Sequence, residues 1–491
     1  MKTTAKFKSI NKKLLFVFAG CTVSQIVTAY FAYNFAPGYE NMAFFPLLYF
    51  VIYLFLFNYK MSETKYPVVS LFYVIMQFIR FVLLPPAIAI AGLNCGVSYL
   101  HPTEDSLRIS VALMFYEFIV TAFFVYIFSR RNAPERKTNI FADKDYYFWN
   151  SGNHISYFIF IIFSIVFFIF FGSRDYINFF VMSANAEARV AAAEVGVLQN
   201  VAHQCLLIAV ITLFIMTLSF LKKKYDFAKR RKYVFLALIV SAFNIGLIIG
   251  ESRAIILYSA LCSILLMIAA FPEHRKTILS YIFVLAGVII FLMTIYKTFY
   301  AFKYTSYMDA INRGTVDSGS ISSTLQIYFM GPEQTALSLD FSKLGGLSPM
   351  QPVFDFIRST PPFSFFVKDS VSTTSVMFNE WIYGGTQQSG YIIPSVGYGY
   401  IFFGVMFSPL VAILNIAISF LFEKSAQKAK TAEFFYLFYY CAIRFSFFMF
   451  QNTPGIWVKV VIMLISGGLL YSIKTRNREE ILLEYEMREN E

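Results

Sequence analysis

Apolar runs long enough to cross a membrane recur along the whole of this 491-residue chain. A helix needs roughly 17 to 25 mainly apolar residues to cross about 30 Å of hydrocarbon. Twelve runs meet this requirement, and we predict one span in each. The predicted spans are Leu14–Phe35, Met42–Phe57, Tyr66–Ala91, Ser110–Phe128, Ile155–Phe171, Val201–Leu221, Tyr233–Ile249, Ala254–Phe271, Ile278–Ile295, Tyr391–Phe422, Phe434–Phe450 and Ile456–Ile473. The tenth is overlong, and Pro394 and Pro409 predict that its first part is broken or re-entrant.

The composition leads to the same fold class. With 58% apolar and only 14% charged residues, a soluble fold would have more apolar surface than it could bury. We therefore predict an all-α polytopic integral membrane protein, with a large extracytoplasmic loop between spans 9 and 10. The first apolar run is expected to be the first span, because it lacks the cleavage pattern of a signal peptide.

Basic residues predict the orientation, because short loops rich in lysine and arginine stay in the cytoplasm. With both termini in the cytoplasm, most of the 41 basic residues fall on that side. The strongest markers are "RRNAPERK" (130–137) and "KKKYDFAKRRK" (222–232). The net charge of +12 follows from this bias and does not indicate nucleic-acid binding.

Two extracytoplasmic segments interrupt the series of spans. The domain plan is a transmembrane region over 1–297 that includes an outer amphipathic segment at 173–204, a large outer loop at 298–390, further spans over 391–473 and a cytoplasmic tail at 474–491. The large loop mixes charged residues with aromatic ones such as Phe341, Phe354 and Trp381, as a sugar-binding cleft requires. The alternative is a solvated loop packed by its own aromatic side chains.

Charged residues within or beside the spans are candidates for function. In "GESR", Glu251 and Ser252 precede a predicted span and Arg253 lies in its first turn, so a helix N-terminus and a guanidinium together favour a phosphate or pyrophosphate. The alternative is that Arg253 pairs with Glu251 and anchors the interface. Arg80, Glu117 and Arg444 lie inside spans, where a charge is costly and is usually kept for a role. For Arg80 and Glu117 the alternative is a buried ion pair that locks two spans together.

Three stretches resemble polysaccharide polymerases of the Wzy family, which join O-antigen or capsular repeat units. "GESRAIILYSALCSILL" resembles their short turn opening a span, and "ARVAAAEVGVLQNVAHQ" resembles their arginine-containing outer segment. "GGTQQSGYIIPSVGYGYIFFGVMFSPL" resembles the glycine-punctuated return from their large loop into the membrane. The resemblance covers the predicted topology and implies an enzyme of the bacterial cytoplasmic (inner) membrane.

The resemblance implies transfer of a growing glycan from a polyprenyl-pyrophosphate carrier onto another lipid-linked repeat unit. A sugar hydroxyl then needs a base, and the candidates are Glu251, Glu333 and Glu380. The departing pyrophosphate and the sugars need positive charge, for which the candidates are Arg80, Arg189, Arg253, Arg313, Arg358 and Arg444. The implied partners are the polyprenyl-pyrophosphate-linked oligosaccharide, membrane lipid, a chain-length regulator and a flippase. No cofactor or metal is expected, because the outer segments contain neither a paired-aspartate motif nor a histidine cluster.

Three other classes stay open at this point. A flippase or other transporter of lipid-linked oligosaccharide also suits many spans with buried arginines, although the two halves show no internal repeat. An O-antigen ligase shares nearly the same design. A structural membrane protein or a channel is the fourth possibility, although no polar stripe suited to a pore is evident.

Overall fold

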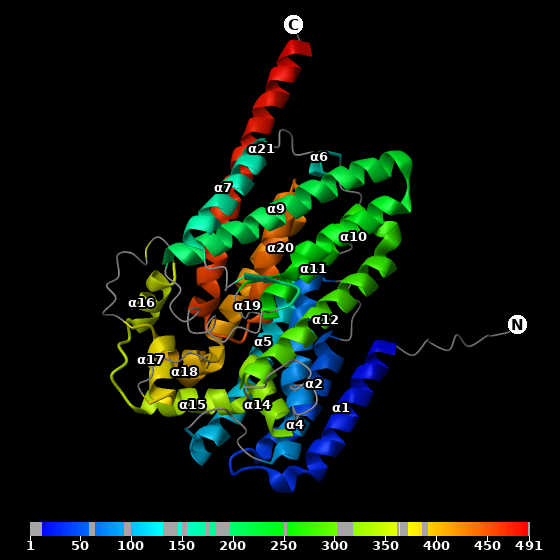
Figure 1. The fold of residues 1–491 in the computed structure, drawn as a ribbon. Helices are drawn as coiled ribbons and strands as arrows, with labels where there is room; N and C mark the ends of the chain where they lie inside the picture. The colour runs from blue at the N-terminus through cyan, green and yellow to red at the C-terminus, as the bar shows by residue number, and fades with distance from the viewer. Residues whose placement is uncertain are drawn as a thin grey trace, which may run out of the picture. The chain divides into compact units, whose positions relative to one another are not determined.

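The structure is a computed structural model, and it describes residues 12–57, 64–92, 100–130, 146–149, 155–172, 177–181, 197–249, 253–301, 318–360, 363, 372–384 and 391–489. Within these ranges nearly all regular structure is helical (Figure 1). Eight helical segments there are long and apolar enough to cross a membrane: Lys12–Tyr30, Glu40–Phe57, Pro67–Ala91, Glu104–Ser129, Val201–Ala228, Pro272–Met293, Leu410–Gln427 and Thr453–Ile473. The prediction of a mainly helical membrane protein is confirmed.

The other predicted spans are also helical, and Ile155–Phe171 has the predicted bounds whereas the rest have changed bounds. Ile155–Phe171, Ala254–Ala270 and Ser395–Phe407 are shorter apolar helices. The predicted Tyr391–Phe422 span is divided into α18 (Ser395–Phe407) and α19 (Leu410–Gln427), with Pro394 before the first helix and Pro409 before the second. Proline lacks the N–H that would continue a helix, so the predicted break is present. The predicted Phe434–Phe450 span is α20 (Ala432–Phe447).

Contacts divide the chain into two compact units, each made of segments distant in sequence. Unit 1 comprises Met1–Glu135, Val316–Phe420 and Phe445–Val458, and unit 2 comprises Arg136–Thr315, Leu421–Arg444 and Lys459–Glu491. Complete elements of unit 1 are α1 (Lys12–Tyr30), η1 (Ala32–Asn34), η2 (Glu40–Phe44), α2 (Phe45–Ile52), η3 (Tyr53–Phe57), α3 (Pro67–Phe78), η5 (Ile79–Leu83), α4 (Leu84–Ala91), α5 (Glu104–Ser129), α14 (Ser318–Tyr328), α15 (Pro332–Lys343), α16 (Gln351–Arg358), α17 (Thr374–Ile382) and α18.

The third predicted span of unit 1 is a single helix with a widened middle. Pro85 and Pro86 cannot donate to the carbonyls four residues earlier, at Phe81 and Val82, and the preceding segment η5 is a π-helix. The hydroxyl of Ser24 on α1 donates to the Val82 carbonyl at 2.5 Å. This bond satisfies an acceptor that the proline leaves without its helical donor.

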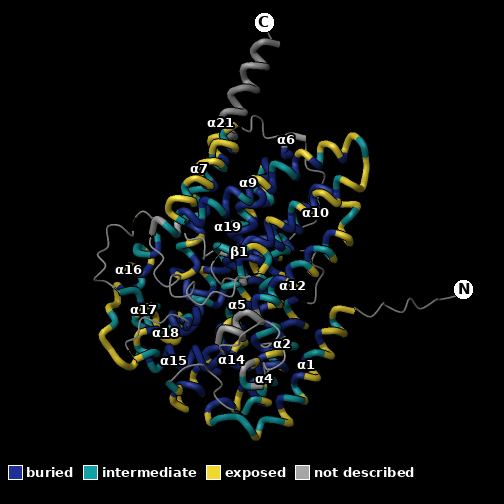
Figure 2. The backbone as a smooth tube through the Cα atoms, in the orientation of Figure 1, coloured by how far each residue is buried: buried dark blue, intermediate teal, exposed yellow. Residues whose placement is uncertain are grey.

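The part of the predicted large loop that belongs to unit 1 forms helices that pack within that unit. α14 packs against α4, and α15 packs against α5 and α18 (Figure 1). Nine of the twelve residues of α15 are buried although its sequence is largely polar (Figure 2). In contrast, α1 exposes apolar side chains such as Phe16, which is 70% exposed. Exposed apolar surface on a long helix suits contact with lipid.

Helix ends of unit 1 meet in two groups. At one group, Gly38 lies so close to α5 that an added Cβ would come within 2.7 Å of the Glu104 carbonyl oxygen. There Asp340 of α15 also accepts hydrogen bonds from the backbone and hydroxyl of Thr103. At the other group, the Lys65 N–H donates to the Ser129 carbonyl at 2.7 Å. The first group joins three segments predicted to be extracytoplasmic, and the second joins two predicted to be cytoplasmic.

Unit 2 contains the rest of the described elements. Its complete elements are α6 (Tyr146–Trp149), α7 (Ile155–Phe171), β1 (Ile177–Phe179), α9 (Val197–Ala228), α10 (Arg231–Gly246), β2 (Leu247–Ile249), α11 (Arg253–Ala270), η7 (Pro272–His274) and α12 (Arg275–Ala301). Parts of α19, of α20 and of α21 (Thr453–Glu489) complete it. The helix predicted within 183–201 lies mostly outside the described residues, and α9 begins at Val197.

The strand pair of unit 2 changes one predicted span. β1 and β2 are antiparallel, with Asn178 opposite Ile248. The predicted Tyr233–Ile249 helix therefore ends at Gly246, where an added Cβ would lie 2.5 Å from the ring of Phe180. Only glycine allows that approach, and the chain continues from it as a strand.

Candidate functional site

A buried ion pair lies at the centre of unit 1. Arg80 belongs to the π-helical segment η5 and Glu117 to the middle of α5. Arg80 Nη1 donates to Glu117 Oε2 at 2.9 Å, and the two side chains are 1% and 0% exposed. Removing one member of such a pair leaves an uncompensated buried charge and costs about 3–5 kcal/mol. The predicted alternative for these two residues, an ion pair between adjacent spans, is present.

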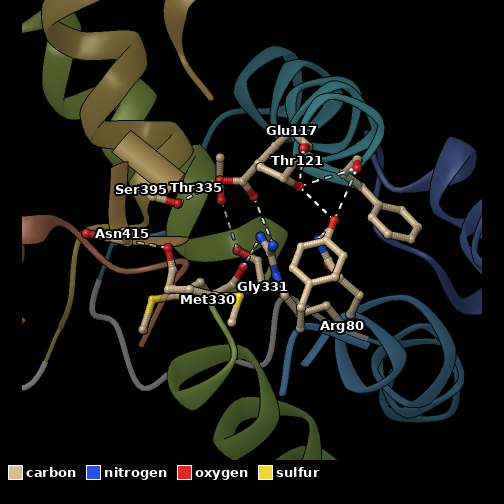
Figure 3. A network of polar contacts seen from close by, with 12 residues as sticks. Arg80, Glu117, Thr121, Met330, Gly331, Thr335, Ser395 and Asn415 are labelled. Carbon is tan, nitrogen blue, oxygen red and sulfur yellow. Dashed lines mark hydrogen bonds and ion pairs between the residues drawn. The ribbon is translucent and has the colours of Figure 1, made fainter. Parts of the chain in front are cut away.

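The guanidinium of Arg80 makes two further contacts with distant segments. Its Nη2 donates to the Met330 carbonyl at 3.3 Å, and its Cζ lies 4.1 Å from the centre of the Phe450 ring. The Met330 contact joins the span to the turn between α14 and α15 (Figure 3). The ring contact adds a cation–π attraction on the flat face of the guanidinium.

The second oxygen of Glu117 holds the start of α18. The Ser395 hydroxyl donates to Glu117 Oε1 at 2.6 Å, and the Ser395 N–H donates to the Phe450 carbonyl at 2.7 Å (Figure 3). Asn415 of α19 donates to the carbonyls of Met449 and Gln451, which follow α20. These bonds connect the broken tenth span to the segment whose Phe450 ring covers Arg80.

The turn between α14 and α15 has a strained backbone. Met330 has a φ of 53°, in the left-handed region that residues other than glycine rarely adopt. After it, the Gly331 N–H donates to the Gln326 carbonyl, and the Glu333 N–H donates to the side-chain oxygen of Gln326 at 3.2 Å. Thr335 donates back to the Gly331 carbonyl at 3.2 Å. Strain of this kind persists where surrounding contacts fix it, and it is concentrated at functional sites.

Glu333 is the predicted base that the structure places beside this turn. It lies in the first turn of α15, is 1% exposed, and has no hydrogen-bond partner for Oε1 among the residues that the structure describes. Burial raises the pKa of Glu333 to about 7. A carboxyl with a pKa near neutrality is suited to accept or donate a proton. The adjacent Gln334 is fully buried and its side-chain amide also has no partner within the described ranges.

The other proposed bases and arginines have different environments. Glu380 is exposed on α17, and Arg358 is half-buried in the last turn of α16. Arg253 is the first residue of α11. Glu251, Arg189 and Arg313 lie outside the described residues.

Arg444 lies in unit 2, in the last turn of α20, and is 8% exposed. Its guanidinium carbon is 5.4 Å from the ring centre of Tyr258 on α11. Tyr258 follows Arg253 by five residues, a rise of about 7.5 Å along a helix. Two of the arginines predicted to bind pyrophosphate, Arg253 and Arg444, are thus both associated with the first half of α11.

Three aromatic residues of the predicted large loop pack against one another. Phe341 lies 5.5 Å from Phe378 and 5.7 Å from Trp381, measured between ring centres, and these residues belong to one apolar cluster. Phe354 is 38% exposed. The alternative of self-packing applies to Phe341, since 94% of its surface is covered by protein while only 6% remains exposed.

Sequence patterns did not reveal several members of the site. Ser395 and the Met330 carbonyl join the site through contacts that span more than two hundred positions, and Thr335 joins it through its bond to Gly331. A partial signal exists in "MGPE", because glycine before proline marks the start of a helix at Pro332. In the described part of the chain, no group of three or more His, Cys, Asp or Glu side chains is arranged to hold a metal ion.

Comparison with known proteins returned no match to this chain, whether to a family model, a curated protein or a solved structure.

Proposed function

We propose that the chain is a membrane glycosyltransferase that joins polyprenyl-pyrophosphate-linked oligosaccharide repeat units into O-antigen or capsular polysaccharide. The observation that carries the proposal is Glu333, a buried carboxyl with a pKa near 7 in a segment predicted to lie outside the cytoplasm. In this proposal Glu333 is the general base. We prefer Glu333 to Glu380 because burial raises the pKa of Glu333, whereas Glu380 is exposed.

The proposed reaction exchanges one bond for another. The acceptor hydroxyl oxygen bonds to the anomeric carbon of the donor glycan as the bond from that carbon to the pyrophosphate oxygen breaks. The hydroxyl proton passes to the Glu333 carboxylate, and the lipid pyrophosphate leaves with the electron pair. General base catalysis of this kind contributes typically about 10²–10⁴-fold to a rate.

Contacts between helix ends support the membrane topology on which the proposal rests. In unit 1, Thr103 and Asp340 belong to two segments predicted to be extracytoplasmic, and they are hydrogen-bonded. In unit 2, Tyr225 donates to Glu273 at 2.8 Å, and both belong to segments predicted to be at the cytoplasmic side. A topology with one span too many or too few between these segments would place the partners on opposite sides of the membrane.

The pyrophosphate ligands in the proposal are Arg189, Arg253 and Arg444. Arg80 is not among them, because Glu117, the Met330 carbonyl and the Phe450 ring already surround its guanidinium. Arg253 and Arg444 remain candidates because a helix N-terminus and two guanidinium groups suit a pyrophosphate. Replacement by lysine should restore activity only partly, since a point charge cannot make the planar two-bond contact.

Surface polysaccharide from cells that carry variant genes tests the proposal. Glu333→Gln should leave a single repeat unit on the acceptor where the parent makes long chains, with the protein still present in the membrane. Glu380→Gln is the matched control, an exposed carboxylate from the same loop that should leave chain length unchanged. Gene deletion should also leave a single repeat unit. Complete absence of repeat units from the acceptor in the deletion strain would identify a transporter of the lipid-linked oligosaccharide instead. Chains of normal length in Glu333→Gln would exclude Glu333 as the base.

A further inference from the structure

We propose that Arg80 is a positioning residue: by holding the Met330 carbonyl, it fixes the strained turn before α15 that keeps Glu333 buried. The inference rests on the proposed function only in naming Glu333 as the base. The role of Arg80 in the turn is a separate claim about geometry and has its own test.

Of the two hydrogen bonds described for Arg80, one neutralises its charge and the other reaches the turn. Nη1 meets Glu117 and Nη2 meets Met330, so the two arms of the planar guanidinium serve different segments. An ammonium group has no such fork, and a lysine at this position can keep the ion pair while losing the second direction of donation. The two roles of Arg80 are therefore separable by substitution.

Met330 is the residue of the turn whose conformation needs stabilisation by a contact from another segment. Its φ of 53° is unfavourable for a side chain with a Cβ, and its carbonyl is the group that Arg80 contacts. Three residues later the chain reaches Glu333, whose N–H is capped by the Gln326 side chain. If the turn relaxes, the first turn of α15 rotates or frays, and Glu333 gains access to water.

Charged residues on the elements packed around α15 do not provide another explanation for the raised pKa of Glu333. On α5, Glu117 pairs with Arg80, Glu104 pairs with Arg108 at 2.7 Å, and Asp105 is exposed. On α15 itself, Asp340 pairs with Lys343 at 2.9 Å. Glu380 on α17 is exposed, and the sequences of α14 and α18 contain no charged residue. Burial of Glu333 is thus the property that the turn controls.

The test uses a hydrophobic carbodiimide, which reacts with protonated carboxyl groups in apolar surroundings, and mass spectrometry to measure modification of Glu333. The full-length protein is purified in detergent and labelled across a pH series. In the parent, labelling of Glu333 should fall as pH rises, with a midpoint near 7. In Arg80→Lys the midpoint should move down by one pH unit or more, so that labelling at pH 7 falls roughly fivefold or further.

Glycine at position 330 separates positioning from a merely structural role. Met330→Gly allows the left-handed conformation without an external hold, so it should restore the midpoint in the Arg80→Lys background. The matched control is Lys229→Gly, which relieves the strain of another left-handed backbone angle, φ 49°, at a site in unit 2. This control should leave the shifted midpoint unchanged.

The outcomes are distinct from those that test the proposed function. An unchanged midpoint in Arg80→Lys, or equal rescue by both glycine substitutions, would overturn the inference. If Arg80→Lys does not fold, Arg80→Gln combined with Glu117→Gln removes both charges and is read by the same labelling and the same rescue. The labelling measures the environment of Glu333 whether or not the protein polymerises glycan.

Discussion

At the scale of single residues, Glu333 is buried and yet must ionise to act as a base, and burial opposes ionisation. Burial raises its pKa from an ordinary value of 4.5 to about 7, which suits proton transfer at neutral pH. As a base it must be ionised, so the polymerisation rate should rise with pH through about 7. Measured with purified protein and lipid-linked repeat units, Glu333→Gln should lower the rate by about 10²–10⁴-fold and remove this rise. A pH profile that is the same in parent and variant would contradict the assignment.

Glu333 should also make the free energy of unfolding depend on pH. This free energy should fall as pH rises, whereas the polymerisation rate should increase. Because the folded protein binds the Glu333 proton more tightly than the unfolded chain does, this stabilisation is complete below pH 4.5 and is lost as pH rises through about 7. The loss is about 3 kcal/mol on the usual conversion of pKa to free energy. Thermal unfolding in detergent at pH 5 and pH 8 should therefore differ less in Glu333→Gln than in the parent.

Residue chemistry made part of this site predictable. A charge inside a span predicts a partner, and Arg80 and Glu117 are each other's partner. Glu333 was one of three carboxylates consistent with a base, and burial distinguishes it from Glu380. Ser395 and Met330 could not be predicted, because their roles depend on contacts across 278 and 250 positions of sequence.

At the scale of elements, α15 and α18 are held together by a close approach at Gly397. An added Cβ there would collide with the Ser338 hydroxyl and lie 2.9 Å from Ser338 Cβ. We expect Gly397→Ala to destabilise the protein by about 1–3 kcal/mol, as overpacking of a filled interior does. The combination with Ser338→Gly should recover part of the loss, and thermal unfolding of both single variants and the double variant measures that coupling.

Gly287 provides the control for this prediction. It lies within α12, and among the described residues no atom beyond the adjoining backbone of that helix stands within 4 Å of an added Cβ. Alanine at this helix-interior position should be neutral or slightly stabilising. Equal effects of Gly397→Ala and Gly287→Ala would show that the packing of α15 on α18 is not the cause.

Sequence signals predicted elements where the backbone chemistry is local. Pro394 and Pro409 predicted the break between α18 and α19, because each proline removes a helical hydrogen bond. The strand Leu247–Ile249 was not predictable, because an apolar run of three residues has the same appearance in a helix and in a strand. The strand conformation of Leu247–Ile249 is instead fixed by pairing with the distant segment Ile177–Phe179.

At the scale of the whole molecule, the order of apolar runs constrains which helix ends share a side of the membrane. The contacts between Lys65 and Ser129 and between Thr103 and Asp340 agree with an alternating order of spans in unit 1. Hydropathy predicts that order, because an apolar run of this length can cross the hydrocarbon once. The identity of the outer side depends on the distribution of basic residues, and this requires a separate measurement.

Single cysteines at two exposed positions measure the orientation of the chain. Leu344, just after α15, is 59% exposed and is predicted to be extracytoplasmic, whereas Phe227, near the end of α9 within the basic segment 222–232, is 94% exposed and is predicted to be cytoplasmic. In a background without the native cysteines, Leu344→Cys should react with a membrane-impermeant maleimide in intact cells, or in spheroplasts if an outer membrane blocks access. Phe227→Cys should react only after the cytoplasmic membrane is opened, because the lysines and arginines around it favour retention in the cytoplasm.

The opposite labelling pattern would reverse the orientation and place Glu333 on the side where lipid-linked repeat units are assembled, which would contradict the polymerase proposal. Labelling of both cysteines in intact cells would instead show that the number of spans between α9 and α15 is wrong.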